Sequence, residues 1–263
     1  MWILAEKAGK SNLPLTQKLS VGQREKEDEK YTTIYIGFDV SRVQGKSEVA
    51  SYAAICEPHG RIIHTHHMSF NGEYLSDTEV RKIINEVLRE YEAARKRFGL
   101  EKVDEIIFFK DGDTRGPLAR NAIESGLEMV KNDLITSGRA SENLKISYIT
   151  VKKRVIHRIF GDVSHLPEGI CIINTKFKCP EAIILTTTPF HKATQSPNIL
   201  KLIMQIGESD ATSIYRIAKE YHDLRFLHWE TWRTQPGTAL PLHIVQHKAK
   251  QLGYGYDTVY IAK

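Results

Sequence analysis

Two aspartates, Asp39 and Asp111, stand at points of the sequence where carboxylates could do chemistry. Asp39 lies within a stretch of alternating apolar residues, and Asp111 follows a short apolar run and a lysine. Neighbouring carboxylates repel each other unless a divalent cation neutralises them, and their hard oxygens suit Mg²⁺ or Mn²⁺. A pair of such ions about 3.5–4 Å apart serves in-line phosphoryl transfer. The two aspartates therefore predict a divalent-metal site, and the alternative is that each one caps a turn.

The elements around these aspartates decide whether they can meet. Residues 33–40 alternate between apolar and other side chains, which is the period of a β-strand and places Asp39 on the face opposite the apolar set. The continuous apolar run at 106–109 is typical of a central strand covered on both faces. Ligand sites of α/β sheets commonly lie at the carboxyl ends of such strands. If the two strands are neighbours, Asp39 and Asp111 converge.

The rest of the pattern predicts a mixed sheet with helices. An apolar stripe from Val80 to Tyr91 predicts a helix, and Ser76 and Glu79 have the spacing of a capping box at its start. Pro117 is expected to open a second helix. The order of elements indicates an α/β layer fold. Further strands are expected at 48–56 and 60–67, forming an antiparallel meander with 33–40, and near 145–151, 169–174 and 182–187, with helices near 197–205, 210–223 and 241–252.

Composition indicates a soluble globular protein. The chain has 263 residues, of which 41% are hydrophobic and 26% charged, enough to build its own core. No apolar run approaches the roughly 20 residues of a membrane helix, and the first residues do not resemble a signal peptide. Cys56, Cys171 and Cys179 are expected to be buried thiols in a reducing compartment rather than disulfides. We therefore expect a cytoplasmic protein with no membrane partner.

The charge distribution suggests a partner. The net charge is only +5, but one short segment contains five basic residues and no acidic one: Lys152, Lys153, Arg154, His157 and Arg158. Such a run predicts salt-dependent, largely sequence-independent contact with phosphates, and the alternative is an ordinary solvated surface.

Residues 1–30 differ from the rest of the chain. A short apolar stretch is followed there by glycine, serine, asparagine and proline, and then by the charged run 24–30. Charge blocks of this kind are usually exposed. We therefore expect a boundary near Lys30, with residues 31–263 forming the main domain.

Four segments together resemble the PIWI domain of prokaryotic Argonaute proteins. They follow one another in the family's order at close to the family's spacing: Ile36–Ser41, Phe108–Gly112, Val151–Phe160 and Leu240–His247. The segment 3–10 is similar to the end of the MID domain, which precedes PIWI in that family. The resemblance implies that residues 1–30 are a MID remnant with a charged linker. It also implies that residues 31–263 form an isolated or truncated RNase H-like domain, with a mixed β-sheet flanked by helices on both faces.

The resemblance also implies a function. Proteins of this family use a guide strand to direct cleavage of a target strand, leaving 5′-phosphate and 3′-hydroxyl ends, with two Mg²⁺ or Mn²⁺ ions held by an Asp-Glu-Asp-Asp/His set. The expected partners are guide and target nucleic acid, DNA or RNA, and the remaining Argonaute domains in cis or in trans. Two alternatives stay open: a catalytically inactive PIWI module that binds a guide–target duplex or a partner chain, and an RNase H-like nuclease that needs no guide.

Asp39 and Asp111 match the family's two aspartates. Glu73, in the segment Asn-Gly-Glu-Tyr, is expected to be the catalytic glutamate, because a loop with a glycine suits insertion into a site. Glu79 is the alternative, although its place in the capping box already gives it a structural role.

The fourth residue of the set should come from the segment near the C-terminus. His247 is the expected residue, and the metal ligands would then be Asp39, Asp111 and His247. His243 is a weaker candidate. A shift of one residue would instead bring Gln246 to the site, and a neutral amide is a poor ligand that would favour binding over cleavage.

Overall fold

The structure, a computed structural model, describes residues 3–4, 32–41, 48–56, 61–70, 76–98, 101–112, 117–153, 155, 169, 171–185, 199–225 and 238–253. Their contacts divide these residues into two compact units. One unit contains the described residues between 28 and 147 together with those after 240. The other contains residues 3–4 and the described residues from 148 to 240.

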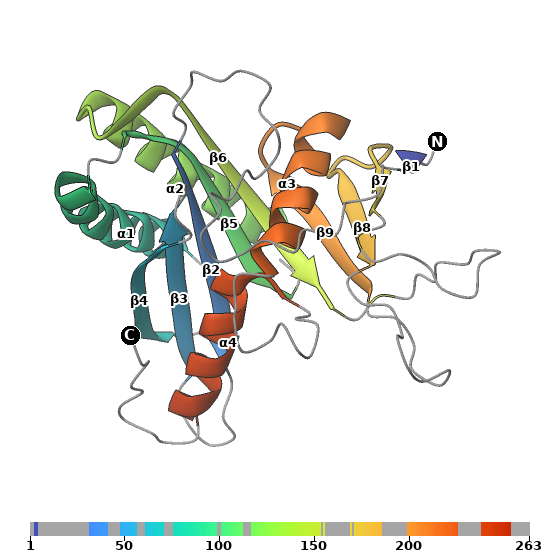
Figure 1. Cartoon of the computed structure of the whole chain (residues 1–263), viewed down its shortest axis with the longest axis horizontal. Helices are drawn as coiled ribbons and strands as arrows, with labels where there is room; N and C mark the ends of the chain where they lie inside the picture. The colour runs from blue at the N-terminus through green and yellow to red at the C-terminus, as the bar shows by residue number, and fades with distance from the viewer. Residues whose placement is uncertain are drawn as a thin grey trace. The chain divides into compact units, whose positions relative to one another are not determined.

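The first unit is built on a mixed sheet in which the strands run in the order β6-β5-β2-β3-β4 (Figure 1). β2, β3 and β4 form an antiparallel meander, as predicted, while β5 lies parallel to β2. Only the first part of β6, up to residue 147, belongs to this unit. The strand bounds are β2 Thr33–Ser41, β3 Glu48–Cys56, β4 Arg61–Phe70, β5 Val103–Asp111 and β6 Ala140–Lys152.

The side chains of β2 and β5 are buried on both faces of the sheet. Ile34, Ile36 and Phe38 are fully buried on one face. On the other face the ring of Tyr35 stacks on that of Phe109, with centroids 6.4 Å apart and planes 5° from parallel. Apolar side chains on both faces of a strand require cover on both sides. The sequence-based prediction of a central, doubly covered strand at β5 is therefore confirmed.

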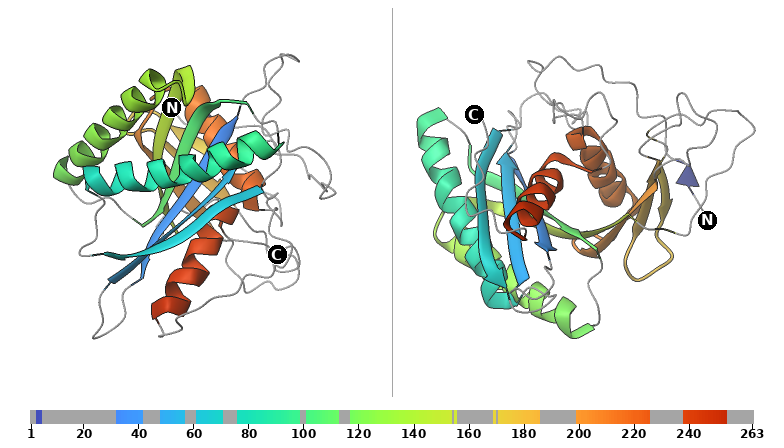
Figure 2. Two further views of the ribbon diagram at one scale, coloured as in Figure 1. Left: turned by 90° about the vertical axis from the view of Figure 1, so that its left-hand side faces the viewer. Right: turned by 90° about the horizontal axis from the view of Figure 1, so that it is seen from below.

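Helices provide this cover. Figure 2 shows α1 and α2 on one side of the strands of this unit and α4 on the other. The apolar stripe predicted for α1 is buried from Val80 to Tyr91. Its capping box is also present, since the Ser76 amide donates to Glu79 Oε2 (2.7 Å) and the Glu79 amide to Ser76 Oγ (3.3 Å). The bounds are α1 Asp77–Phe98, α2 Pro117–Thr136 and α4 Leu240–Gly253.

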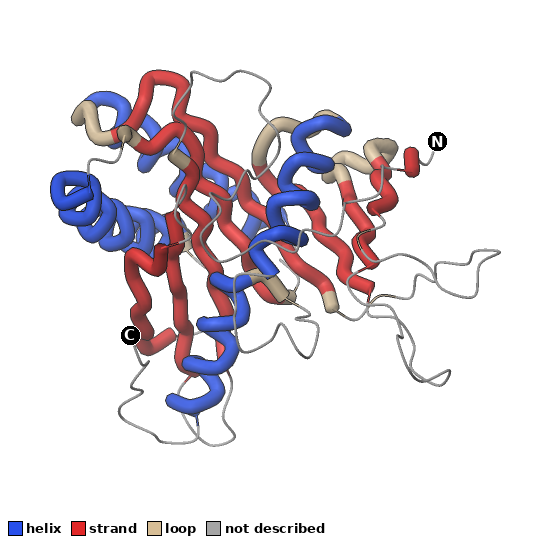
Figure 3. Tube along the Cα trace, in the orientation of Figure 1, coloured by secondary structure: helices blue, strands red, loops and turns tan. Residues whose placement is uncertain are grey.

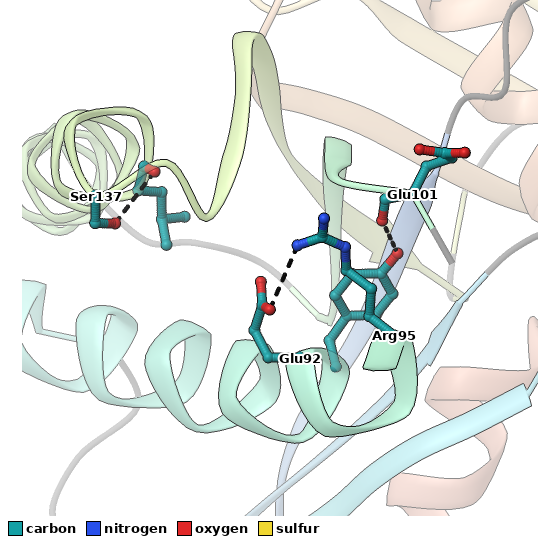
Figure 4. Close-up of polar contacts among 6 residues, drawn as sticks. Glu92, Arg95, Glu101 and Ser137 are labelled. Atoms are coloured by element: carbon teal, nitrogen blue, oxygen red, sulfur yellow. Dashed lines mark hydrogen bonds and ion pairs between the residues drawn. The ribbon is translucent and has the colours of Figure 1, made fainter. Parts of the chain in front are cut away.

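Polar contacts fix the end of α1 and the approach to β5 (Figure 4). The Tyr91 hydroxyl donates to the main-chain oxygen of Glu101 (2.6 Å), so the last turns of α1 are tied to the segment that begins β5. Beside it, Arg95 and Glu92 form an ion pair one helical turn apart (3.5 Å). Directly after α2, the hydroxyl of Ser137 donates to the main-chain oxygen of Leu134 in the last turn of that helix (3.2 Å). These hydrogen bonds define where the two helices end.

The second unit contains an antiparallel sheet in the order β1-β7-β8-β9-β6, to which β6 contributes its residues from 148 onward (Figure 3). Helix α3, Ala211–Leu224, packs against β7 and β8. Glu181 and Lys201 form an ion pair between β8 and β9 (2.6 Å). The strand bounds are β1 Ile3–Leu4, β7 Cys171–Asn174, β8 Glu181–Leu185 and β9 Ile199–Ile206.

The helix predicted at 197–205 is wrong, because this segment is strand β9. Its leucines, lysine, methionine and glutamine are good helix formers. In the structure, however, β9 pairs with β6 on one side and β8 on the other, so the sheet satisfies its backbone groups. Leu200, Leu202 and Met204 are buried at a spacing of two. Tertiary pairing therefore overrides local propensity here. The other predicted strands are present with shifted ends, and β6 begins five residues earlier than expected.

Two expectations from composition concern the cysteines and the membrane. Cys171 is buried and Cys179 half-buried, and neither forms a disulfide. The side chain of Cys56 lies outside the described residues. In the part of the chain that the structure describes, no helix combines the length and the apolar character needed to cross a bilayer.

Candidate metal centre

The structure places Asp39 and Asp111 at the carboxyl ends of neighbouring strands. β2 and β5 are parallel, and the register pairs Phe38 with Lys110, so the next residues along the two strands are Asp39 and Asp111. Adjacent strands lie about 4.8 Å apart. Both aspartates are half-buried. The two carboxylates therefore lie at the same level of the sheet and at the same edge.

Both aspartates belong to the face of the sheet that α4 covers. Gly37 pairs with Phe109, and side chains alternate along a strand, so Asp39 shares the face of Gly37 and Asp111 that of Phe109. A Cβ added at Gly37 would stand 2.4 Å from the carbonyl carbon of Pro241, in the first turn of α4. Only glycine permits so close an approach of two backbones. Because Gly37 has no side chain, the start of α4 packs directly on β2, two residues before Asp39.

Helix α4 presents Gln246 to Asp111. Pro241 suits the first turn of a helix, and Leu242 and Val245 are fully buried, which fixes the rotation of α4 about its axis. Gln246 Nε2 donates to Asp111 Oδ2 at 3.2 Å. A carboxylate oxygen accepts hydrogen bonds, so the nitrogen of the amide faces it. Gln246, which the sequence left open as an alternative, therefore contacts Asp111.

The same helix carries the two histidines that were candidates for the fourth residue of the set, His243 and His247. His243 is half-buried on α4, and a role for it as the fourth residue of the set stays a prediction. The side chain of His247 lies outside the described residues, although its backbone is part of α4. His247 as a catalytic residue and metal ligand stays a prediction.

Lys110 is a component of this site that sequence reasoning missed. Its side chain is only 7% exposed, and its Nζ donates to the main-chain oxygen of Asp111 (3.0 Å). Gly112 follows with a φ of 80°, which is favourable for glycine. The two residues together define the path of the chain at Asp111. A lysine directly after an apolar run, still within the strand, was the available signal, because a lysine is rarely buried without a specific partner.

Of the two candidates for the catalytic glutamate, Glu79 and Glu73, the structure describes only Glu79. Glu79 is held in the capping box of α1, where its Oε2 accepts from both the amide and the hydroxyl of Ser76. This contact gives Glu79 the structural role that its spacing predicted. Glu73 lies outside the described residues, and its place in the catalytic set stays a prediction.

The two carboxylates of the site suit a divalent cation. Asp39 and Asp111 offer the hard carboxylate oxygens that Mg²⁺ and Mn²⁺ prefer. An amide N–H, as Gln246 presents it to Asp111, does not ligate a cation. Among the described residues there is no group of three or more histidines, cysteines, aspartates and glutamates that could hold a metal ion.

The basic run is only partly within the described residues. Lys152 is half-buried at the end of β6, and Lys153 is exposed just beyond it. Arg154, His157 and Arg158 lie outside the described residues. A phosphate-binding role for this run stays a prediction.

Comparisons with known proteins identify the family. The structure is similar to that of Marinitoga piezophila Argonaute in complex with 5′ OH guide RNA and target DNA, with a TM-score of 0.55 and 17% identity over 86% of this chain and 30% of that one. It is also similar to Clostridium butyricum Argonaute bound to a guide DNA and a 19-mer target DNA, with a TM-score of 0.54 and 18% identity over 84% of this chain and 26% of that one.

This chain thus spans less than a third of the length of these Argonautes. Identities this low show a shared fold, which confirms the expected RNase H-like α/β architecture. No curated protein matches the chain. The model of the Piwi domain family, however, matches residues 4–226, most of the sequence. The chain therefore belongs to the Piwi domain family.

Proposed function

We propose that this chain binds a guide–target nucleic-acid duplex and holds one divalent cation, Mg²⁺ or Mn²⁺, at Asp39 and Asp111. The two described Argonaute relatives are complexes of guide and target strands, one with guide RNA and one with guide DNA. The proposal extends this class of partner to the present chain. It leaves the choice between DNA and RNA to the remaining domains, in cis or in trans.

The observation that favours binding over cleavage is the hydrogen bond from Gln246 to Asp111 (3.2 Å). A cation at the aspartate pair would neutralise the carboxylates and offer a positive charge to a phosphate of the bound strand. Cleavage by the two-ion route needs further ligands for the second ion. The N–H of Gln246 that faces Asp111 is not one of them. Binding without efficient cleavage is therefore the function that the described geometry supports best.

Guided cleavage is the second candidate. The register of β2 and β5 favours it, because it sets Asp39 and Asp111 side by side as a metal-dependent nuclease requires. In this candidate Glu73 and His247 complete the catalytic set. The protein would then hold two Mg²⁺ or Mn²⁺ ions and cut the target strand to leave 5′-phosphate and 3′-hydroxyl ends.

One experiment separates the two candidates. The purified chain is mixed with a labelled target strand in Mn²⁺, with and without a complementary guide, and both duplex binding and cleavage products are measured. Asp111→Asn serves as the matched variant, since it keeps the shape of the side chain and removes its charge. We expect salt-sensitive duplex binding by both proteins and little cleavage by either.

The other outcomes are equally informative. Guide-dependent cleavage that Asp111→Asn abolishes would establish the second candidate. Cleavage of the same strand without a guide would indicate a simple RNase H-like nuclease. Absence of duplex binding at low salt would overturn the proposed function of this chain.

A further inference from the structure

We infer that the loop between β7 and β8, residues 175–180, is a contact site for unpaired nucleotides of a bound strand. Phe177 in this loop is 57% exposed, and Lys176 and Lys178 on either side of it are exposed as well. The ring offers a face on which a base can stack, and the two ammonium groups can contact the neighbouring phosphates. The inference rests on the proposed function for the class of partner, and it adds a site that acts outside the duplex.

The exposure of Phe177 is unusual in the described part of the chain. The large hydrophobic side chains that are exposed there are Met129 and Phe177. Met129 follows an exposed acidic residue, Glu128, on α2, so its surroundings do not attract a polyanion. A single exposed apolar residue needs no explanation. An aromatic ring between two cations, however, is the combination that sites for single-stranded nucleic acid use.

Hydrogen bonds hold both ends of the loop. At the end of β7, the Lys176 amide donates to Oδ1 of the buried Asn174 (3.0 Å). Before β8, the main-chain oxygen of Pro180 accepts from the Met204 amide of β9 (2.9 Å). In Figure 1 the loop lies at the upper end of these strands. Because the loop is tied to the sheet on both sides, stacking of a base on Phe177 costs less conformational entropy than it would on a free loop.

The charge of the loop favours an anionic partner. The segment 171–180 contains two lysines and no acidic residue. Glu181, directly after it, forms an ion pair with Lys201 (2.6 Å) and so does not offset the lysines of the loop. At the start of α3, Asp210 accepts from the hydroxyl of Ser213 (2.7 Å). The two positive charges beside Phe177 are therefore suited to the phosphates on either side of a stacked base.

The test compares the affinities of three DNA probes by fluorescence anisotropy. They are a blunt duplex, the same duplex with about eight unpaired nucleotides added at each end in turn, and the unpaired strand alone. We expect the wild type to bind an extended duplex about tenfold more tightly than the blunt one. Phe177→Ala and Phe177→Leu should lose this gain and keep the wild-type affinity for the blunt duplex. Leucine remains apolar, but it has no aromatic face on which a base can stack.

Three further variants complete the test. Met129→Ala removes the other exposed hydrophobic side chain, which belongs to the other unit, and should change nothing. Phe177→Trp should retain the gain, because indole also stacks on bases. Lys176→Ala/Lys178→Ala should reduce the slope of log K against log salt for the unpaired strand by about 1.4. All these side chains are exposed, so each Tm should stay within about 2 °C of that of the wild type.

The possible results separate this inference from the proposed function. Equal affinity of the wild type for blunt and extended duplexes would overturn the inference alone, and so would a gain that Phe177→Ala or Phe177→Leu retains. Binding of the unpaired strand that depends on Phe177, without duplex binding, would support the inference and overturn the proposed function. No binding of any probe would overturn both.

A lipid surface is the other partner that a ring between two lysines could contact. One ring and two charges bury too little apolar area to anchor a protein stably on a bilayer. Vesicles that contain phosphatidylserine provide the check. Vesicle binding that Phe177→Ala abolishes, with the affinity for all three DNA probes unchanged, would overturn the inference.

Discussion

Single residues at the ends of elements have measurable roles in this fold, and Asp210 at the start of α3 is a clear case. Its Oδ1 accepts from the amide of Ser213 (2.9 Å) and its Oδ2 from the hydroxyl (2.7 Å). These hydrogen bonds from Ser213 lower the pKa of the exposed Asp210 carboxyl below its ordinary value, because they favour the charged form. The negative charge also lies at the positive end of the helix dipole.

Replacing Asp210 by alanine should therefore destabilise the protein. Loss of such an N-cap costs about 1 kcal/mol, or about 2–4 °C in Tm for a chain of this size. Since the folded pKa is the lower one, the contribution of the charge is complete above the unfolded value, near 4, and is lost as the pH falls through the folded value. Thermal unfolding should show the difference at pH 7 and a smaller one near pH 2.

Asp210→Asn is the control for this prediction. Asparagine is an equally good N-cap without a charge, so its Tm should stay within about 1 °C of the wild type at neutral pH. An alanine variant with the wild-type Tm at pH 7 would show that the cap contributes nothing.

Cys171 allows a prediction about reactivity. Burial of its side chain disfavours the thiolate and raises the pKa of the thiol to about 12. At pH 8 the reactive thiolate is then on the order of one molecule in 10,000. In the variant Cys56→Ser/Cys179→Ser, Cys171 should remain unlabelled by a thiol reagent over hours and react within minutes in denaturant. Rapid labelling of the folded variant would contradict this burial.

At the scale of elements, the contact between β2 and α4 controls the geometry of the candidate site. Gly37 lies two residues before Asp39, and the start of α4 rests on its Cα. The same contact sets how far along the sheet α4 begins. Gln246 can therefore lie beside Asp111 because Gly37, on the neighbouring strand β2, has no side chain.

Gly37→Ala should disturb both stability and site. The added Cβ would meet three backbone atoms at 2.4–2.6 Å, and backbone cannot move aside as a flexible side chain can. We expect a loss of roughly 2–3 kcal/mol, measured as a lower urea midpoint. Mn²⁺ binding at the aspartate pair should also change, because α4 must shift.

Gly112→Ala is a useful comparison. Gly112 has a φ of 80° but no atom within 4 Å of an added Cβ, so alanine there meets backbone strain alone. The cost should be about 1–2 kcal/mol. If Gly37→Ala proved as stable as the wild type, α4 could not pack on β2 as closely as described.

At the scale of the whole molecule, the chain consists of two units and represents less than a third of the length of the Argonautes it resembles. The candidate metal centre lies in one unit, and the described part of the basic run belongs to the other. Mutation of the basic run should therefore leave cation binding unchanged.

Lys152 and Lys153 provide the test of this separation. Each phosphate contact that is lost lowers the slope of log K against log salt by about 0.9 for duplex DNA. Lys152→Ala/Lys153→Ala should therefore reduce the slope by about 1–2 without changing Mn²⁺ affinity. Lys82→Ala/Lys96→Ala removes the same charge from exposed positions on α1 and should leave the slope unchanged. Equal slopes in both double variants would rule out a phosphate-binding role for this pair.

The sequence by itself determined the features that depend on local periodicity. Alternation at 33–40, the apolar run at 106–109 and the stripe of α1 each report which side chains must be buried, and burial is what builds the core. The capping box of α1 is equally local, because its two partners lie three residues apart. The aspartates at the strand ends were found for the same reason.

Only the tertiary structure decided the features that depend on distant partners. β9 is a strand because β6 and β8 flank it, which its own helix-forming residues do not reveal. Gln246 contacts Asp111 because Gly37 lets the backbone of α4 approach the sheet and buried leucine and valine side chains fix its rotation. Neighbouring residues on a helix point about 100° apart, so a shift of one residue exchanges an imidazole for an amide, and only packing sets that register.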